Sequence, residues 1–201
     1  TPENIYKKRR SFIKSVGLGA STLAMSSIPF LNKSLASERD KLTSYKDITT
    51  YNNYYEFGTS KSDPYRNSQI FKTTPWDIAI EGEVEKPIKL SMEEISEMFI
   101  SEERIYRLRC VEGWSMVIPW MGFSLSKLLS KVNPTNKAKF VEFESVYDPA
   151  QMKGQRYPVL NWPYNEGLRI DEAMHPLTTV VTGLYGKKLP NQNGAPLRIF
   201  I

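Results

Sequence analysis

The chain contains one cysteine and one histidine in 201 residues. A single cysteine excludes an intramolecular disulfide, and with it a small secreted scaffold held together by disulfide bonds. A single histidine, His175, excludes a metal site built from several imidazoles. Glycine-rich phosphate-binding loops, a Gly-x-Ser-x-Gly nucleophile turn and a Cys-x-x-Cys pair are also absent. The common nucleotide-binding, serine-hydrolase and zinc functions are therefore not indicated.

Positive charge is concentrated at the N-terminus. The formal net charge is +5, but residues 1–36 hold six of the 27 basic side chains and only one of the 22 acidic ones. The remaining residues are neutral overall, which argues against a nucleic-acid partner. With 40% hydrophobic and 24% charged residues, the composition is typical of one globular domain of ordinary size.

Residues 1–36 resemble an export signal. Arg9 and Arg10 precede Ser-Phe-Ile-Lys, and an apolar stretch rich in small residues runs from 16 to 31 and ends near Ala36. This order is typical of a secretory signal peptide of the twin-arginine type. An uncleaved membrane anchor is the alternative, but the stretch contains serine, threonine and proline and is short of the roughly 20 apolar residues that a spanning helix needs. We therefore expect the twin-arginine export machinery to deliver the protein to the periplasm, with cleavage near Ala36.

Residues 37–75 show no regular hydrophobic period. The segment is polar and aromatic, and its run from Tyr51 to Gly58 matches neither a helix nor a strand. We predict an extended arm or loop here.

Residues 76–201 predict an α+β domain. A helix is expected from Ser91, where Ser91 and Glu94 form a capping box, and a second from Ser124 to a stop at Asn133-Pro134. A short helical stretch is expected near 171–174. Strands are expected over 76–82, 105–111, 140–145 and 177–182. These elements do not alternate regularly, which argues against a doubly wound sheet. Residues 196–201 read as a strand in mid-course, so we expect the chain to continue beyond Ile201.

Cys110 is the first candidate for chemistry. Arg107 and Arg109 precede it and would favour its thiolate form, and a thiolate is a soft ligand for a transition metal. The alternative is a structural cysteine that acts as a small hydrophobic side chain, which the local sequence alone favours. The second candidate is the segment 191–198, whose amides, glycine and arginine could hold a phosphate and a polar heterocycle but also make an ordinary turn.

Three segments match one family when they are taken together and in order. They are the arm run 51–57, the run 107–120 around Cys110, and the run 186–198. With the N-terminal signal, they resemble the catalytic subunits of periplasmic protein-methionine-sulfoxide reductases, which are molybdopterin oxidoreductases of the sulfite oxidase fold family. The resemblance implies a mixed sheet with peripheral helices, a Mo-molybdopterin cofactor, and repair of methionine sulfoxide in oxidised exported proteins by oxygen-atom transfer.

The resemblance also implies site residues and partners. Cys110 would ligate the molybdenum, and the cofactor contacts would come from Asn52, Tyr55, Glu56, Ser145, Asn193 and Arg198. Ser145 stands where the family has threonine, and a Gly/Lys cofactor-binding segment of the family would lie beyond Ile201. Electrons would come from the respiratory chain through a haem-containing membrane subunit. The substrates would be oxidised periplasmic proteins, and residues 76–201 would be an incomplete molybdopterin-binding domain.

Two alternative functions stay open at this point. A sulfite oxidase-like enzyme, or another molybdenum oxidoreductase acting on S- or N-oxides, would use the same metal–cysteine centre. Sulfite oxidation needs an anion site, however, and the neutral body offers little concentrated positive charge beyond Arg107 and Arg109. A metal-free exported binding module is the alternative outside the enzyme class.

Overall fold

The fold is built from antiparallel strands with short helices around them. The computed structural model describes residues 41–201, which form one compact unit, and the predicted export signal lies outside these residues. Three sheets are present: the hairpin β1 (Asp77–Ile80)–β2 (Ile88–Ser91), the hairpin β5 (Phe140–Glu144)–β6 (Asn165–Arg169), and a five-stranded central sheet. All strand pairs within these residues are antiparallel, which confirms the α+β prediction.

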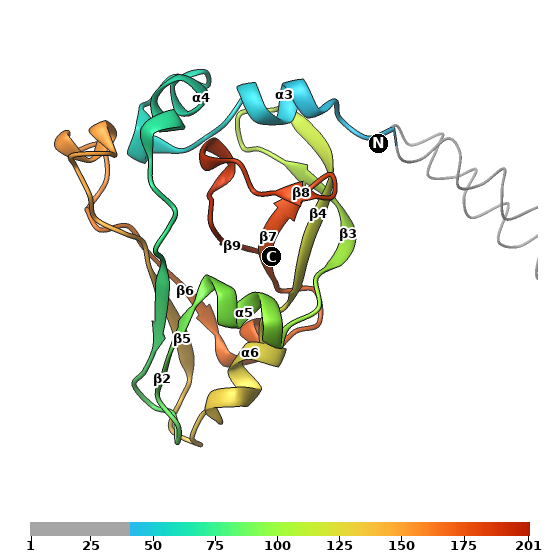
Figure 1. The fold of residues 1–201 in the computed structure, drawn as a ribbon, viewed down its shortest axis with the longest axis vertical. Helices are drawn as coiled ribbons and strands as arrows, with labels where there is room; N and C mark the ends of the chain where they lie inside the picture. The colour runs from blue at the N-terminus through green and yellow to red at the C-terminus, as the bar shows by residue number, and fades with distance from the viewer. Residues whose placement is uncertain (1–40) are drawn as a thin grey trace, which may run out of the picture. The chain divides into compact units, whose positions relative to one another are not determined.

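The central sheet carries two of the predicted site residues, Cys110 next to the end of β3 (Glu102–Arg109) and Arg198 at the start of β9 (Arg198–Phe200). It also comprises β4 (Ser115–Ser124), β7 (Thr179–Leu184) and β8 (Lys187–Lys188). The strand order is β3-β4-β7, and both β8 and β9 pair with β7 (Figure 1). A β-bulge at Met121/Gly122 shifts the β4–β7 register. Gly122 is required there, because a Cβ atom would lie 2.1 Å from the carbonyl oxygen of Val180.

The two predicted amphipathic helices are confirmed. Helix α5 (Met92–Met98) begins with the complete capping box of Ser91 and Glu94, and α6 (Leu125–Val132) ends at Asn133 in the left-handed conformation with φ 54°. Helix α7 (Ile170–Ala173) lies at the predicted short helical stretch. No helix within residues 41–201 has the length and apolar character to cross a membrane.

The prediction of an extended arm is wrong for residues 45–70. They form α3 (Tyr45–Thr50), the 3-10 turn η1 (Tyr55–Phe57), α4 (Asp63–Asn67) and the 3-10 turn η2 (Ser68–Ile70). Each of these helices is one or two turns long, too short for a hydrophobic period to appear in the sequence. Short helices are stabilised mainly by tertiary packing, and here Ile48 and Phe57 are each only 1% exposed.

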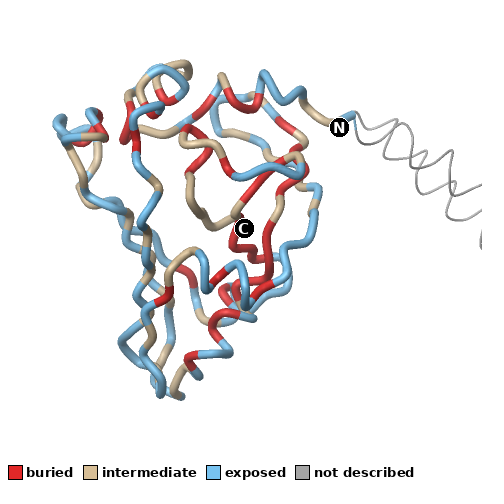
Figure 2. The backbone as a smooth tube through the Cα atoms, in the orientation of Figure 1, coloured by how far each residue is buried: buried red, intermediate tan, exposed pale blue. Residues whose placement is uncertain are grey.

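The central sheet is covered on both faces. Adjacent residues of β7 point to opposite sides, so Val180 joins one hydrophobic cluster with α5 and α6, and Val181 joins another with Ile48 of α3 and Trp120 of β4. Figure 2 shows the buried backbone concentrated along β4, β7 and α6. Strand β4 was not predicted, because Pro119 in its interior argues against a strand. Strands β2, β6 and the two-residue β8 were not predicted either.

Candidate functional site

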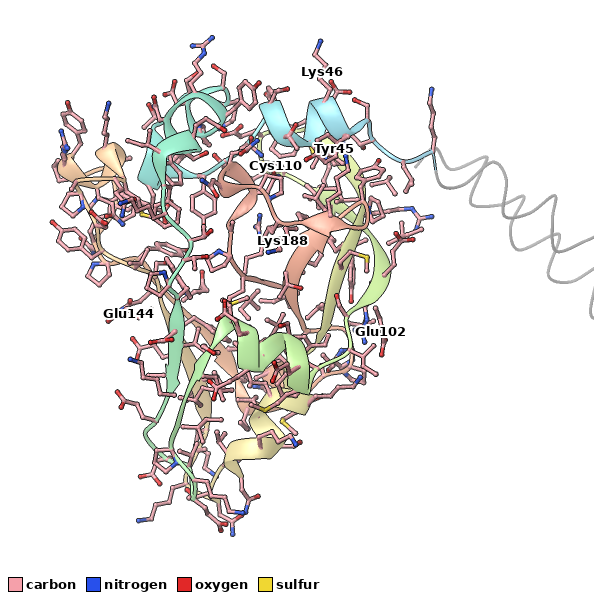
Figure 3. All side chains as sticks on the ribbon, viewed as in Figure 1. Tyr45, Lys46, Glu102, Cys110, Glu144 and Lys188 are labelled. Carbon is pink, nitrogen blue, oxygen red and sulfur yellow. The ribbon has the colours of Figure 1, made fainter. Side chains whose placement is uncertain are left out.

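Cys110 lies in the turn that connects β3 to β4. The strand predicted over 105–111 ends at Arg109, two residues before its predicted end, and the Cys110 backbone amide donates a hydrogen bond to the Trp114 carbonyl at 2.9 Å. Gly113 closes the turn with φ +92°. The thiol is free and partly exposed, and Figure 3 shows Cys110 at the end of the hairpin, below α3.

Lys61 is a cation that faces this turn. Its Nζ donates to Glu112 Oε1 at 2.8 Å and to Asn53 Oδ1 at 3.0 Å, and lies 5.8 Å from the centroid of the Tyr55 ring. The hydrogen bond to Glu112 raises the pKa of Lys61, and the charge of Cys110 contributes in the same direction. The hydrogen bond from Lys61 in turn lowers the pKa of Glu112. Arg109, by contrast, directs its guanidinium to the Ser115 hydroxyl at 3.2 Å.

Asn52 and Asn193 meet at one backbone carbonyl. The side-chain amide nitrogens of both residues donate to the carbonyl oxygen of Ile48, at 2.9 Å for Asn52 and 3.1 Å for Asn193. This shared acceptor fixes the orientation of each amide, because only the NH₂ end can donate. Both Oδ1 atoms are left buried without a partner. They are two of the four buried side-chain N or O atoms within residues 41–201 that lack one.

Glu56 is buried, and the two ionisable side chains close to it, Tyr54 and Arg198, are half-buried. Burial raises the pKa of Glu56, and the nearby guanidinium of Arg198 only partly offsets this effect. Burial lowers the pKa of Arg198, while the charges of Tyr54 and Glu56 oppose that change. Arg198 donates to the Asn193 carbonyl at 3.0 Å and lies 5.5 Å from the centroid of the Trp120 ring. The guanidinium is thus held in place by neutral partners.

A large open cleft passes beside this group. Its volume is about 2010 Å³, and Tyr55, Glu56, Ser145 and Arg198 are among its lining residues. Ser145 follows β5, and its amide donates to the Tyr164 carbonyl at 2.9 Å. A pocket for a small molecule is typically about 300–1,000 Å³, so a ligand held by these four residues would fill only part of the cleft.

The close approach of Gly154 fixes the position of the η1 turn. Gly154 belongs to the 3-10 turn η3 (Lys153–Arg156), and a Cβ atom on it would lie 1.9 Å from the carbonyl oxygen of Tyr55. Any side chain at position 154 would therefore push against the backbone that carries Tyr55 and Glu56. The nearby residues Phe57, Phe71 and Met152 form a small core of their own.

The structure brings most of the predicted site residues together in two groups. The amides of Asn52 and Asn193 share Ile48, while Tyr55, Glu56, Ser145 and Arg198 share the cleft. The contact between Arg198 and the Asn193 carbonyl joins the two groups. Cys110 does not line the cleft, and its turn contacts the rest of the site through Lys61 and through an edge-to-face contact between Trp114 and Tyr51, with ring centroids 5.3 Å apart.

Sequence reasoning missed Lys61, Tyr54 and Gly154. Lys61 lies in a Gly/Ser-containing loop and is 51 residues from Glu112 along the chain. No local pattern encodes a contact over such a distance. Covariation with Glu112 across an alignment of homologues is the signal that could have found it.

The donor set suits a ligand with N–H groups, an anionic group and a soft metal. The Oδ1 atoms of Asn52 and Asn193 are buried acceptors without a partner, so each could accept a hydrogen bond from a ligand N–H group. Leaving such an acceptor unpaired costs about 1–3 kcal/mol. Arg198 is suited to a phosphate, and the Cys110 sulfur is suited to a transition metal. Within residues 41–201, no group of three or more His, Cys, Asp or Glu residues is arranged to hold a metal ion.

Comparison with known proteins identifies similar sequences and a similar fold. A family model described as "Oxidoreductase molybdopterin binding domain" matches residues 65–201. A structure of the sulfane dehydrogenase SoxCD from Paracoccus pantotrophus aligns with a TM-score of 0.53 and 14% identity, over 90% of this chain and 52% of that one. This likeness concerns the fold alone, and it agrees with the predicted fold class.

Three relatives carry the name protein-methionine-sulfoxide reductase catalytic subunit MsrP. The protein from Xanthomonas axonopodis pv. citri (strain 306) is 49% identical over 214 residues, which cover 100% of this chain and 66% of that protein. The protein from Xanthomonas campestris pv. campestris is 57% identical over 81% of this chain and 50% of its own length. The protein from Burkholderia mallei (strain ATCC 23344) is 46% identical, over 100% of this chain and 66% of its own length. The chain thus spans between half and two thirds of these relatives.

Proposed function

Since the chain belongs to the family of oxidoreductase molybdopterin-binding domains, we propose that it is the larger part of a catalytic subunit that reduces methionine sulfoxide in oxidised proteins. The observation that carries the proposal is the pair of unpartnered amide oxygens on Asn52 and Asn193, located beside Arg198 in a chain whose single thiol lies on a nearby turn. The similarity to relatives named as methionine sulfoxide reductases supports the choice of substrate.

Residues of both groups would hold the cofactor. Asn52 and Asn193 would accept hydrogen bonds from the N–H groups of a pterin, and Arg198 would bind its phosphate through a planar fork. Tyr55, Glu56 and Ser145 would contact the cofactor from the cleft. Cys110 would supply a thiolate ligand to molybdenum. When bound, the molybdenum cofactor would supply the two-electron redox chemistry of oxygen-atom transfer.

The protein's own share is positioning and proton supply. Reduction of one sulfoxide to a thioether consumes two electrons and two protons and releases one water molecule. The buried Glu56 carboxyl lines the cleft, and because burial raises its pKa, it would keep a proton on its Oε atoms to a higher pH than an exposed glutamate does. The exposed turn around Cys110 would leave room for a methionine side chain on a protein surface, since Val111 next to it is fully exposed.

The cellular setting is part of the same proposal and rests on the predicted signal and on the family resemblance. The predicted signal over residues 1–36 would direct a protein that has already folded around its cofactor through the twin-arginine machinery to the periplasm. There, a haem-containing membrane subunit would deliver electrons from the respiratory chain. Oxidised periplasmic proteins would be the substrates.

The decisive experiment uses the full-length, exported protein. We expect stoichiometric molybdenum by metal analysis and, with a reduced dye as electron donor, conversion of methionine sulfoxide to methionine in an oxidised test protein. Sulfite oxidation with an electron-accepting dye is measured in parallel. Molybdenum with sulfite oxidation but no sulfoxide reduction would move the assignment to the sulfite oxidase-like alternative. Absence of molybdenum in correctly exported protein would favour a metal-free binding module.

A further inference from the structure

Lys61 connects the two parts of the site that carry different chemistry. Its backbone carbonyl accepts a hydrogen bond from the backbone N–H of Asn52 at 2.9 Å. Its side-chain Nζ lies 2.8 Å from Glu112 Oε1 in the Cys110 turn. A single residue therefore links a predicted cofactor contact at one end to the turn of the predicted metal ligand at the other.

The environment of Lys61 holds its ammonium group in one place. The side chain is 19% exposed, and its Nζ has a second acceptor in Asn53 Oδ1 at 3.0 Å. Nζ also lies over the Tyr55 ring, 5.8 Å from the ring centroid. Glu112 is held as well, because its other carboxylate oxygen accepts from Trp114 Nε1 at 3.3 Å. With several partners on each side, this pair is more constrained than a typical surface salt bridge.

Besides this ion pair, the turn is held by its own backbone and by Trp114, which packs against the hydrophobic cluster that contains Ile48 and Trp120. Two backbone hydrogen bonds close it, and Val111 is fully exposed. Apart from the strands that flank it, the contacts found between the turn and the 51–61 segment are the Lys61–Glu112 pair and the Trp114–Tyr51 edge-to-face contact. A turn that carries a metal ligand must hold its sulfur in a fixed direction.

We propose that Lys61 is a positioning residue: its ion pair with Glu112 fixes the Cys110 turn against the segment that bears Asn52 and Tyr55, so that the sulfur and the cofactor contacts keep one relative arrangement. The inference rests on the proposed function for the identity of the ligand. The arrangement it describes concerns this chain's own residues. Lys61 acts through the turn and is not itself a ligand.

The test uses the full-length protein and four variants. Lys61→Met removes the charge but keeps the length of the side chain, and Lys61→Arg keeps a cation that can donate to Glu112. The double variant Lys61→Glu with Glu112→Lys reverses the pair. Lys127→Met is the matched control. Lys127 lies on α6, away from the turn, and its Nζ pairs with Glu102 Oε1 of β3 at 3.2 Å, so the substitution also breaks one lysine–glutamate pair.

Two readouts separate positioning from general stability. Amide hydrogen exchange at Cys110 and Gly113 should become up to about fivefold faster in Lys61→Met, which corresponds to the loss of one surface ion pair, while exchange in α6 stays unchanged. The molybdenum retained after dialysis should fall in Lys61→Met and recover in Lys61→Arg and in the reversed pair. The unfolding midpoint should match that of the Lys127→Met control.

Several results would overturn the proposal. One is amide exchange in the turn of Lys61→Met at the same rate as in the wild type. Another is faster exchange with molybdenum fully retained. A third is failure of Lys61→Arg to recover either the exchange rate or the molybdenum content. If Lys61→Met does not fold, the reversed pair decides, because recovery there requires the ion pair and not a lysine at position 61. Lack of sulfoxide reduction by the wild type would refute the proposed function but leave the exchange and metal comparisons valid.

Discussion

Cys110 is the only thiol of the chain, so no second sulfur can replace it when it is substituted. We expect Cys110→Ser to abolish sulfoxide reduction, by at least about a hundredfold, because a hydroxyl is a much poorer ligand for molybdenum than a thiolate. The fold should persist, since the side chain is partly exposed in a turn whose hydrogen bonds are made by the backbone. Activity, molybdenum content and circular dichroism of the full-length protein check this. Retained turnover would refute the role of Cys110.

Glu56 predicts a dependence of stability on pH. Burial raises its pKa above the ordinary value of 4.5, so the folded chain holds this proton to a higher pH than the unfolded chain does. The folded state binds more protons in that interval, and the free energy of unfolding therefore decreases as pH rises above about 4.5. Glu56→Gln carries no titrating group and should lack this decrease.

The measurement is a set of urea unfolding curves for the wild type and Glu56→Gln from about pH 3 to pH 7. The difference in unfolding free energy should move in favour of the variant as pH rises, and should become constant at the acid end, where the carboxyl is protonated in both states. Parallel stability curves across the whole range would contradict a raised pKa for Glu56.

At the scale of elements, the contact between η1 and η3 predicts a position that tolerates no side chain. Gly154→Ala would place a Cβ atom 1.9 Å from the Tyr55 carbonyl oxygen, whereas Gly167→Ala on β6 would meet only the Val141 carbonyl oxygen, at 4.0 Å. We expect Gly154→Ala to lower the free energy of unfolding by about 1–3 kcal/mol, as other overpacked sites do, and to reduce molybdenum retention by displacing Tyr55 and Glu56.

Gly167→Ala is the matched control and should leave both quantities nearly unchanged. Denaturant unfolding and metal analysis of the two variants make the comparison. Equal stabilities would show that the η1 backbone shifts without cost and that it does not fix the cleft.

Elements with a clear hydrophobic pattern were predictable from the sequence, whereas the short helices before residue 71 and the ten-residue strand β4 were not. Helices α5 and α6 have an amphipathic stripe with a capping box or a stop signal. Helix α3 has six residues, and its apolar Ile48 is explained only by the sheet on which it packs. Strand β4 was hidden by Pro119 and by the bulge at Gly122, which are tolerated because of the neighbouring strands.

The candidate site divides in the same way. Resemblance placed the predicted contacts on segments that the structure brings close together, and it could do so because those segments carry continuous motifs. Lys61 and Gly154 have no motif of their own: each matters through a contact with a residue about 50 to 100 positions away in the chain. Such contacts depend on the complete fold and leave no local trace in one sequence.

For the whole molecule, the predicted export signal would determine the compartment, and this can be tested. Arg9 and Arg10 lie outside the described residues, and their role stays a prediction. Replacing both arginines by lysine keeps the charge but removes the pair that the twin-arginine receptor recognises. We expect the full-length variant to remain in the cytoplasm, folded and loaded with molybdenum. Cell fractionation with metal analysis checks this, and normal accumulation in the periplasm would show that another export route operates.

The hydrogen bond from Asn193 to the Ile48 carbonyl has a consequence for timing, because the two residues are 145 positions apart. A ribosome adds about 5–20 residues per second, so Ile48 is made on the order of ten seconds or more before Asn193 exists. Throughout that interval, the nascent chain has only one of the two amides that meet at this carbonyl. Loading of a ligand that needs both must therefore follow translation past Asn193, however abundant the ligand is while the chain is being made.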